Sequence, residues 1–211
     1  YTVKDTLSLH DALPISDGSR AGLCLNGSRC VALRAVQLGW ADREVEIHTD
    51  HQILRASVVP DDGGRTGRVT LEIDPPRAAT RWLDLPAGAA ASRGAFVDTG
   101  DPHLVVEVDG FEDFVDRARA LRHDAVLGPA GANVHFVDRR ATPWTIRSFE
   151  RGVEDETLAC GSGCVSAVAA LGEGSTRLRT RSGADLVVTP GGARWRLEGP
   201  AVLVFTAEWS R

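Results

Sequence analysis

The sequence contains the same short cysteine motif twice. The segments CLNG (24–27) and CGSG (160–163) both read C-x-[NS]-G, and 136 positions separate their cysteines. Each motif precedes a run rich in alanine, valine and serine. A motif that recurs before two similar segments indicates two related halves. We therefore predict an α/β chain of two similar domains, related by a pseudo-twofold, that brings the two cysteines face to face.

A helix is predicted after each motif, over residues 28–38 and 163–171. A cysteine just before a helix N-terminus lies at the positive end of the helix dipole, which lowers its pKa from about 8.5. The first-turn amides can also bind a carboxylate. Two such helix ends would suit inversion of a carbon next to a carboxylate, because one thiolate removes a proton and the opposite thiol returns one. Cys24 and Cys160 are therefore the candidate base and acid.

The two other cysteines, Cys30 and Cys164, lie inside the predicted helices and are interpreted as core residues. The spacings C-x5-C and C-x3-C differ from the pairs typical of zinc sites, and no secretory signal favours disulfides. We expect no metal. Five histidines have no metal-ligand spacing and are interpreted as structural or solvent-exposed: His10, His48, His51, His123 and His135.

Alternating and apolar segments predict the remaining elements. A third helix is expected over 112–122, where Phe114, Val115, Ala118 and Leu121 share one face. Strands are expected at 43–49, 53–59, 68–73, 95–98, 103–108, 133–137, 144–149, 177–181, 185–189, 193–197 and 201–207. The segment Asp74-Pro75-Pro76 interrupts this pattern and is the candidate domain boundary.

Composition excludes several classes of function. The net charge is −5 without a basic block, which argues against a nucleic-acid partner. No segment approaches the roughly 18 apolar residues of a membrane helix, and the absence of a secretory signal favours the cytoplasm. Lys4 is the single lysine and lies in the N-terminal segment that fits poorly with the rest of the chain, which argues against a pyridoxal phosphate Schiff base, so we expect no cofactor.

Longer segments around both motifs resemble one known family. Residues 150–163 (ERGVEDETLACGSG) closely resemble the signature of diaminopimelate epimerases around their second active cysteine, and residues 17–30 resemble the signature around the first. Residues 98–106, 128–138 and 199–209 resemble further family segments in the same order. The resemblance runs from about residue 17 to the end of the chain.

The resemblance implies a fold and an activity. Each domain would be a curled mixed β-sheet around a central helix, with residues 17–76 and a returning strand at 200–209 in the N-terminal domain and residues 77–199 in the C-terminal domain. The activity would be interconversion of LL- and meso-diaminopimelate without cofactor or metal, in lysine and peptidoglycan precursor biosynthesis. The expected partner is this small amino acid rather than nucleic acid or a membrane, and a homodimer is left open.

The resemblance also implies roles for individual residues. Cys24 and Cys160 would be the acid and base, His103 would help to set their protonation, and Glu150 would join them as a catalytic residue. Glu150 and Arg151 would bind the distal end of the substrate, because a carboxylate suits an ammonium group and a guanidinium forks onto a carboxylate. The substrate-binding set would be Leu25, Asn26, Asp101, Asn133, Glu150, Arg151, Gly161 and Ser162.

The sequence departs from the family at several positions. Leu25 stands where the family usually has glycine, Asp101 where asparagine is common, and Ile15 where the family has a substrate-binding asparagine. Residues 1–16 resemble translated sequencing-adapter DNA, so we assign them no function and expect an N-terminally truncated copy. Such a truncation would leave strand edges of the first domain unpaired.

Two alternatives remain. The first is a related two-cysteine racemase of the proline type. Glu150 and Arg151 argue against it, because its substrate has no second amino-acid end for them to bind. A catalytically inactive, truncated scaffold is favoured by Leu25 and by the missing N-terminal segment.

Overall fold

The computed structural model describes residues 6–8, 23–61 and 63–206. In that part of the chain, 13 strands form one mixed sheet, accompanied by three α-helices. The helices are α1 (Leu25–Gln37), α2 (Phe114–Arg122) and α3 (Gly161–Leu171). The strands are β1 (Thr6–Ser8), β2 (Glu44–His48), β3 (Ile53–Pro60), β4 (Thr66–Ile73), β5 (Arg81–Asp84), β6 (Arg93–Asp98), β7 (Pro102–Glu107), β8 (Asn133–Asp138), β9 (Trp144–Glu150), β10 (Asp155–Thr157), β11 (Thr176–Arg179), β12 (Asp185–Thr189) and β13 (Trp195–Val202).

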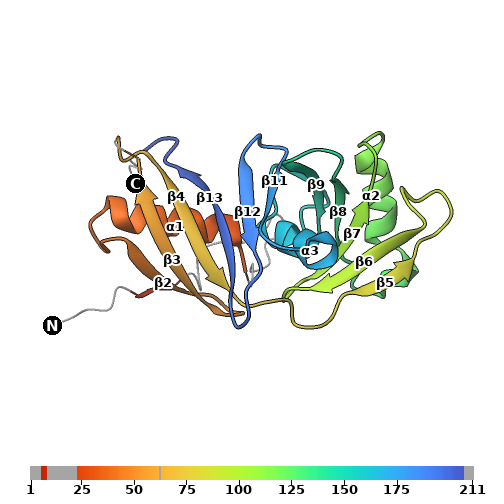
Figure 1. Ribbon diagram of the computed structural model, residues 1–211, viewed down its shortest axis with the longest axis horizontal. Coiled ribbons are helices and arrows are strands. Elements are labelled where there is room, and N and C mark those ends of the chain that lie inside the picture. Colours follow the sequence, from red (N-terminus) through yellow and green to blue (C-terminus); the bar gives the residue numbers. More distant parts are fainter. Residues whose placement is uncertain (1–5, 9–22, 62, 207–211) are drawn as a thin grey trace, which may run out of the picture.

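The sheet has the strand order β1-β2-β3-β4-β13-β12-β11-β9-β8-β7-β6-β5, and β10 pairs with β9. The pairs β1–β2, β7–β8 and β9–β11 are parallel, and the others are antiparallel. Figure 1 shows the sheet curled around two helices: α1 lies against β2, β3, β4 and β13, and α3 lies against β6, β7, β8 and β12. The α+β class with a large mixed sheet and few helices is confirmed.

Helix α1 begins three residues earlier than the sequence predicted. Cys24 has the extended conformation of an N-cap, and its sulfur accepts the amide of Gly27 at 3.3 Å, which satisfies one of the unpaired first-turn donors. The helix ends before Gly39, whose φ of 70° is readily adopted only by glycine. Its buried face includes Ala32 and Leu33, which belong to the larger hydrophobic cluster.

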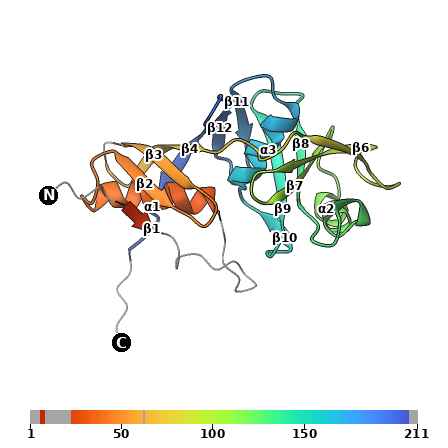
Figure 2. The ribbon, with the colours of Figure 1, turned by 90° about the horizontal axis from the view of Figure 1, so that it is seen from below.

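Helix α3 is buried on most of its circumference. Its residues from Gly163 to Val168 are all buried, because the small side chains predicted by the sequence allow strands to approach on several sides. Helix α2 instead covers the outside of the sheet, at the opposite end of the molecule from α1 (Figure 2). Phe114, Ala118 and Leu121 form its buried face as predicted, and Val115 is partly buried.

Strand β13 connects the two halves of the sheet. It pairs with β12 on one side and with all eight residues of β4 on the other. The sequence analysis predicted two strands here, at 193–197 and 201–207. That prediction is wrong, because pairing with β4 carries the extended backbone through Gly199 and Pro200 as far as Val202. Residues 203–206 of the second predicted strand are not in a strand, and residue 207 lies outside the described residues.

Most other predicted strands agree with the structure to within two residues, but β5 and β10 were not predicted. Strand β1 lies within residues 1–16, beside β2, and the adapter interpretation of that segment stays a prediction. The boundary near Asp74 also stays a prediction. The larger hydrophobic cluster extends from α1 to α3 across that boundary. No helix in the described part of the chain is both long and apolar enough to cross a membrane.

Candidate active site

The two cysteines occupy equivalent positions in their helices. Cys24 precedes α1 with φ −128° and ψ 95°, and Cys160 precedes α3 with φ −121° and ψ 109°. The sulfur of Cys24 accepts a hydrogen bond from the amide of Gly27. The amide of Gly163 has the same offset in α3, and its interaction with the sulfur of Cys160 lowers the pKa of that thiol. The recurring sequence motif therefore corresponds to a recurring local structure.

The first turns of α1 and α3 touch each other. The side-chain amide of Asn26 donates a hydrogen bond to the carbonyl of Ala159 at 2.6 Å, which ties α1 to the residue before Cys160. A Cβ atom added at Gly161 would lie 2.8 Å from the Cβ of Leu25, so only glycine permits this approach. Leu25 is the first residue of α1 and is buried. Leu25, which stands where the family usually has glycine, packs its side chain beside Gly161, and its backbone is helical.

A buried cation lies beneath the first turn of α1. Arg29 is 6% exposed, and its guanidinium donates to the carbonyl of Leu25 at 3.2 Å and to the side-chain oxygen of Asn26 at 2.7 Å. Its positive charge interacts with Cys164 and Cys30 and, more weakly, with Cys24. Arg29 was not predicted as a site residue; its signal was its place two residues after the first C-x-[NS]-G motif.

Several predicted substrate-binding residues meet where β7, β8 and β9 begin or end. Asn133, the first residue of β8, accepts the amide of Arg151 at 2.8 Å and donates to the carbonyl of Pro102. The guanidinium of Arg151 donates to the carboxylate of Asp101 at 2.8 Å. The predicted residues Asp101, Asn133 and Arg151 therefore form one contact network.

Glu150, at the end of β9, links that network to Cys160. The hydroxyl of Thr157 donates to the Glu150 carboxylate. Burial raises the pKa of Glu150, whereas hydrogen bonds with Thr157 and Cys160 oppose that rise. Burial also raises the pKa of Cys160 well above its usual value, and the nearby Glu150 charge raises it further. The lowered pKa expected for Cys160 from the helix dipole is therefore wrong, because burial outweighs the dipole.

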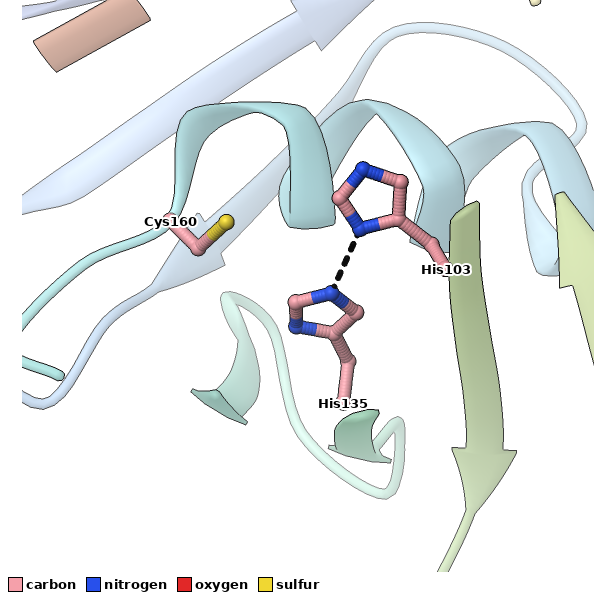
Figure 3. A group of neighbouring side chains, drawn as sticks. All are labelled: His103, His135 and Cys160. Atoms are coloured by element: carbon pink, nitrogen blue, oxygen red, sulfur yellow. Dashed lines mark hydrogen bonds between the residues drawn. The ribbon is translucent and has the colours of Figure 1, made fainter. Parts of the chain in front are cut away.

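The imidazoles of His103 and His135 lie beside the thiol of Cys160 (Figure 3). Nδ1 of His103 is 2.8 Å from Nε2 of His135, and Nδ1 of His135 is 2.9 Å from the hydroxyl oxygen of Ser148. His103, His135 and Cys160 each offer an atom within 4.8 Å of the other two. The sequence analysis interpreted His135 as structural or solvent-exposed. The structure places it in the site, fully buried.

The spacing of the two imidazoles fits a hydrogen bond. Two nitrogen ligands of a tetrahedral zinc ion, each about 2.0–2.1 Å from the metal, lie about 3.3 Å apart. The observed 2.8 Å separation of the His103 and His135 nitrogens is shorter. Burial lowers the pKa of His135 to about 3 and that of His103 well below its usual value, with further lowering of His103 by His135 and Arg151. Both imidazoles are therefore neutral near pH 7.

A small pocket opens beside the junction of the two helices. The empty space within it, including the part open to solvent, is about 200 Å³. Leu25 and Ser162 are the predicted site residues that line it, whereas Cys24 and Cys160 do not. Gly161 and Ser162 form the first turn of α3. That the two sulfurs face each other across one cleft stays a prediction.

Comparisons of the sequence with known proteins identify one family. A family model described as diaminopimelate epimerase matches residues 95–205. A diaminopimelate epimerase from a Hydrogenobaculum species is 34% identical over 90% of this chain and 71% of its own length.

Two solved structures share the fold. A predicted epimerase from Pseudomonas aeruginosa has a TM-score of 0.62 and 16% identity, over 85% of this chain and 73% of its own. A probable proline racemase from Agrobacterium radiobacter has a TM-score of 0.59 and 17% identity, over 83% of this chain and 64% of its own.

Proposed function

Because the chain belongs to the diaminopimelate epimerase family, an isomerase family, we propose that it interconverts LL- and meso-2,6-diaminopimelate through Cys24 and Cys160. The reaction serves the synthesis of lysine and peptidoglycan precursors, and we expect it in the cytoplasm. The observation that carries the proposal is the pair of cysteine-capped helices whose first turns touch at Asn26–Ala159 and Leu25–Gly161.

The proposed reaction is a proton exchange on two faces of one carbon. One cysteine, as thiolate, removes the proton from the α-carbon, and the other donates its S–H proton to the opposite face. The stereocentre inverts, and the two cysteines exchange protonation states. The positive ends of α1 and α3 favour the α-carboxylate and the negative charge that develops beside it.

The protonation of the free protein suggests the starting roles. Burial and Glu150 raise the pKa of Cys160, so this residue carries its proton near neutral pH and is suited to be the acid for one stereoisomer. The proposal assigns the base for that stereoisomer to Cys24, whose sulfur lies near the buried guanidinium of Arg29. The opposite stereoisomer would use the reverse assignment.

The distal amino-acid end of the substrate would meet Glu150 and Arg151. A carboxylate recognises an ammonium group, and a guanidinium recognises a carboxylate in two-point geometry. The backbone amide of Arg151 donates a hydrogen bond to the side-chain oxygen of Asn133 at 2.8 Å, which fixes the position of the Arg151 backbone. Asp101 competes for the same guanidinium. In this proposal the substrate carboxylate must displace Asp101 from Arg151.

The test is deuterium incorporation from D2O into the α-position of diaminopimelate over many turnovers, starting from the LL stereoisomer. The wild-type chain should exchange this hydrogen, and Cys160→Ala or Cys24→Ala should lower the rate by about 10²- to 10⁴-fold, the usual contribution of an acid or base. Cys30, interpreted from the sequence as a core residue, is exposed within α1, so that interpretation is wrong. Cys30→Ala is the matched control and should exchange normally. Undiminished exchange in Cys160→Ala would refute the proposal.

Proline is the second substrate for the same assay. The similarity in fold to a proline racemase makes it the natural comparison. Exchange on proline without exchange on diaminopimelate would favour the racemase alternative, and absence of exchange on both would favour the inactive scaffold.

A further inference from the structure

Three buried side chains form a hydrogen-bonded series that the proposed reaction does not use. Ser148 on β9, His135 on β8 and His103 on β7 lie on neighbouring strands. His135 and Ser148 are register partners, so their side chains lie next to each other across the strand pair. All three are at most 3% exposed. The series runs from the sheet interior to the side chain beside Cys160.

Counting protons along this series selects one arrangement. A neutral imidazole has one N–H and one unprotonated nitrogen. Either His103 Nδ1–H donates to His135, which in turn donates to Ser148, or every hydrogen bond runs in the opposite direction. The second arrangement places an N–H on Nε2 of His103, a buried atom without a hydrogen-bond partner. Orphaned buried N–H groups are rare, and an unused acceptor is less costly. The first arrangement is therefore favoured.

We propose that the Ser148–His135 pair holds His103 in the tautomer protonated at Nδ1, which leaves Nε2 of His103 as an unprotonated acceptor in the site. In this proposal, which rests on the proposed function, His135 is a positioning residue that acts through His103. It makes His103 a neutral hydrogen-bond acceptor that faces the Cys160 thiol group without itself becoming protonated.

The surroundings keep His103 neutral. Burial, and then the neighbouring His135 and Arg151, disfavour a positive charge on His103, and the Cys160 thiol lies beside it. The negative charge of Glu150, at the end of β9, raises the pKa of Cys160. A Cβ atom at Gly163 would clash with the ring of His135, so α3 packs directly against the imidazole. The series is thus enclosed by β7, β8, β9 and α3.

Two substitutions at His135 separate positioning from packing. His135→Gln keeps an acceptor that can reach Nδ1 of His103 but leaves part of the ring volume empty. His135→Phe fills the ring volume against Gly163 but removes both nitrogens. A positioning role predicts that Gln is the better replacement, whereas a packing role predicts that Phe is better. The control is His123→Phe, at an exposed histidine after α2.

The direct measurement is the tautomer of His103, read from ¹⁵N–¹H correlation spectra of ¹⁵N-histidine-labelled protein. The wild-type chain and His135→Gln should show Nδ1 protonated and Nε2 unprotonated. His135→Phe should lose the preference for Nδ1–H. In the deuterium exchange assay, His135→Phe should slow turnover by about 10- to 100-fold, the scale expected for a misplaced catalytic group, and His135→Gln should slow it less.

The proposal is overturned if wild-type His103 carries its proton on Nε2, or if His135→Phe keeps both the tautomer and the rate. The tautomer measurement does not require catalysis, so it stands apart from the proposed function. Failure of Cys160→Ala to stop exchange would refute the epimerase mechanism, while the tautomer of His103 would still decide the role of His135.

Discussion

The regions around Cys24 and Cys160 have the same backbone and opposite surroundings. Both cysteines are N-caps with similar φ and ψ. In both, the sulfur interacts with the backbone amide three residues later in the chain. Cys24 is half-buried near the cation of Arg29, whereas Cys160 is 4% exposed beside the acid Glu150 and two neutral histidines. Local sequence thus sets the conformation of each cysteine, and tertiary packing sets its electrostatic environment.

This difference suits a reaction with two unlike partners. An acid and a base must hold different numbers of protons at the start of each turnover, although their roles reverse with the stereoisomer. A buried thiol beside a carboxylate retains its proton. The contrast between the two regions can be tested in each of them separately.

The largest effect is expected at Glu150. Glu150→Gln removes the negative charge that raises the pKa of Cys160, so the pH at which Cys160 becomes alkylated should fall. Turnover should decrease by about 10²-fold or more if the carboxylate takes part in proton transfer. Iodoacetamide labelling against pH, followed by peptide mass spectrometry, measures both cysteines in one sample. An equal shift at Cys24 would contradict the contrast.

Acid should destabilise the Cys160 region before the Cys24 region. The folded-state pKa values of His135, about 3, and of His103 lie below the usual 6.5, so the unfolded state binds more protons in this range. Stability is therefore complete above about pH 6.5 and falls below it, by up to about 1.4 kcal/mol per pH unit for each histidine. Hydrogen exchange should increase in α3 before α1, and His135→Gln should reduce the slope. A flat profile between pH 6.5 and 5 would argue against two buried neutral histidines.

The contact between the two helices predicts a loss of stability of about 1–3 kcal/mol for Gly161→Ala, because the new Cβ would overlap Leu25. Gly174→Ala, where a Cβ would meet open space, is the matched control. Urea denaturation measures both variants. A second substitution, Leu25→Gly, should recover part of the loss in Gly161→Ala. Additive losses would mean that the two residues do not share the contact.

The smallest effect is expected at Asp101. Asp101→Asn weakens the ion pair with Arg151 and should free the guanidinium for the substrate. Exposed pairs contribute about 1 kcal/mol or less, so KM for diaminopimelate should fall by about two- to fivefold while kcat changes little. A higher KM would indicate that Asp101 binds the substrate directly, as the family resemblance implied.

Local patterns predicted the parts of the molecule that depend on local interactions. The helices after both cysteines, the apolar face of α2 and most strands follow from residue spacing. The continuous strand β13 was missed, because its length depends on pairing with β4, more than 120 positions earlier. His135 was missed as well, although alternation along 133–137 places it on the same face as Asn133. Its importance depends on His103 and Ser148, which only the sheet register brings beside it.

The raised pKa of Cys160 could not be predicted from the motif. The helix dipole is a local property, but the loss of solvation depends on every element that covers the sulfur. The motif alone therefore does not determine the proton affinity of its cysteine.

The central claim is that two groups on opposite faces of one carbon exchange protons with the substrate. Conversion of LL-diaminopimelate in D2O, stopped after a few per cent of reaction, tests it most directly. The account predicts that the inverted carbon of the meso product carries deuterium while the recovered LL substrate retains its hydrogen. A product that retains the original hydrogen would mean that a single group moves the proton between faces, and it would contradict the two-cysteine account.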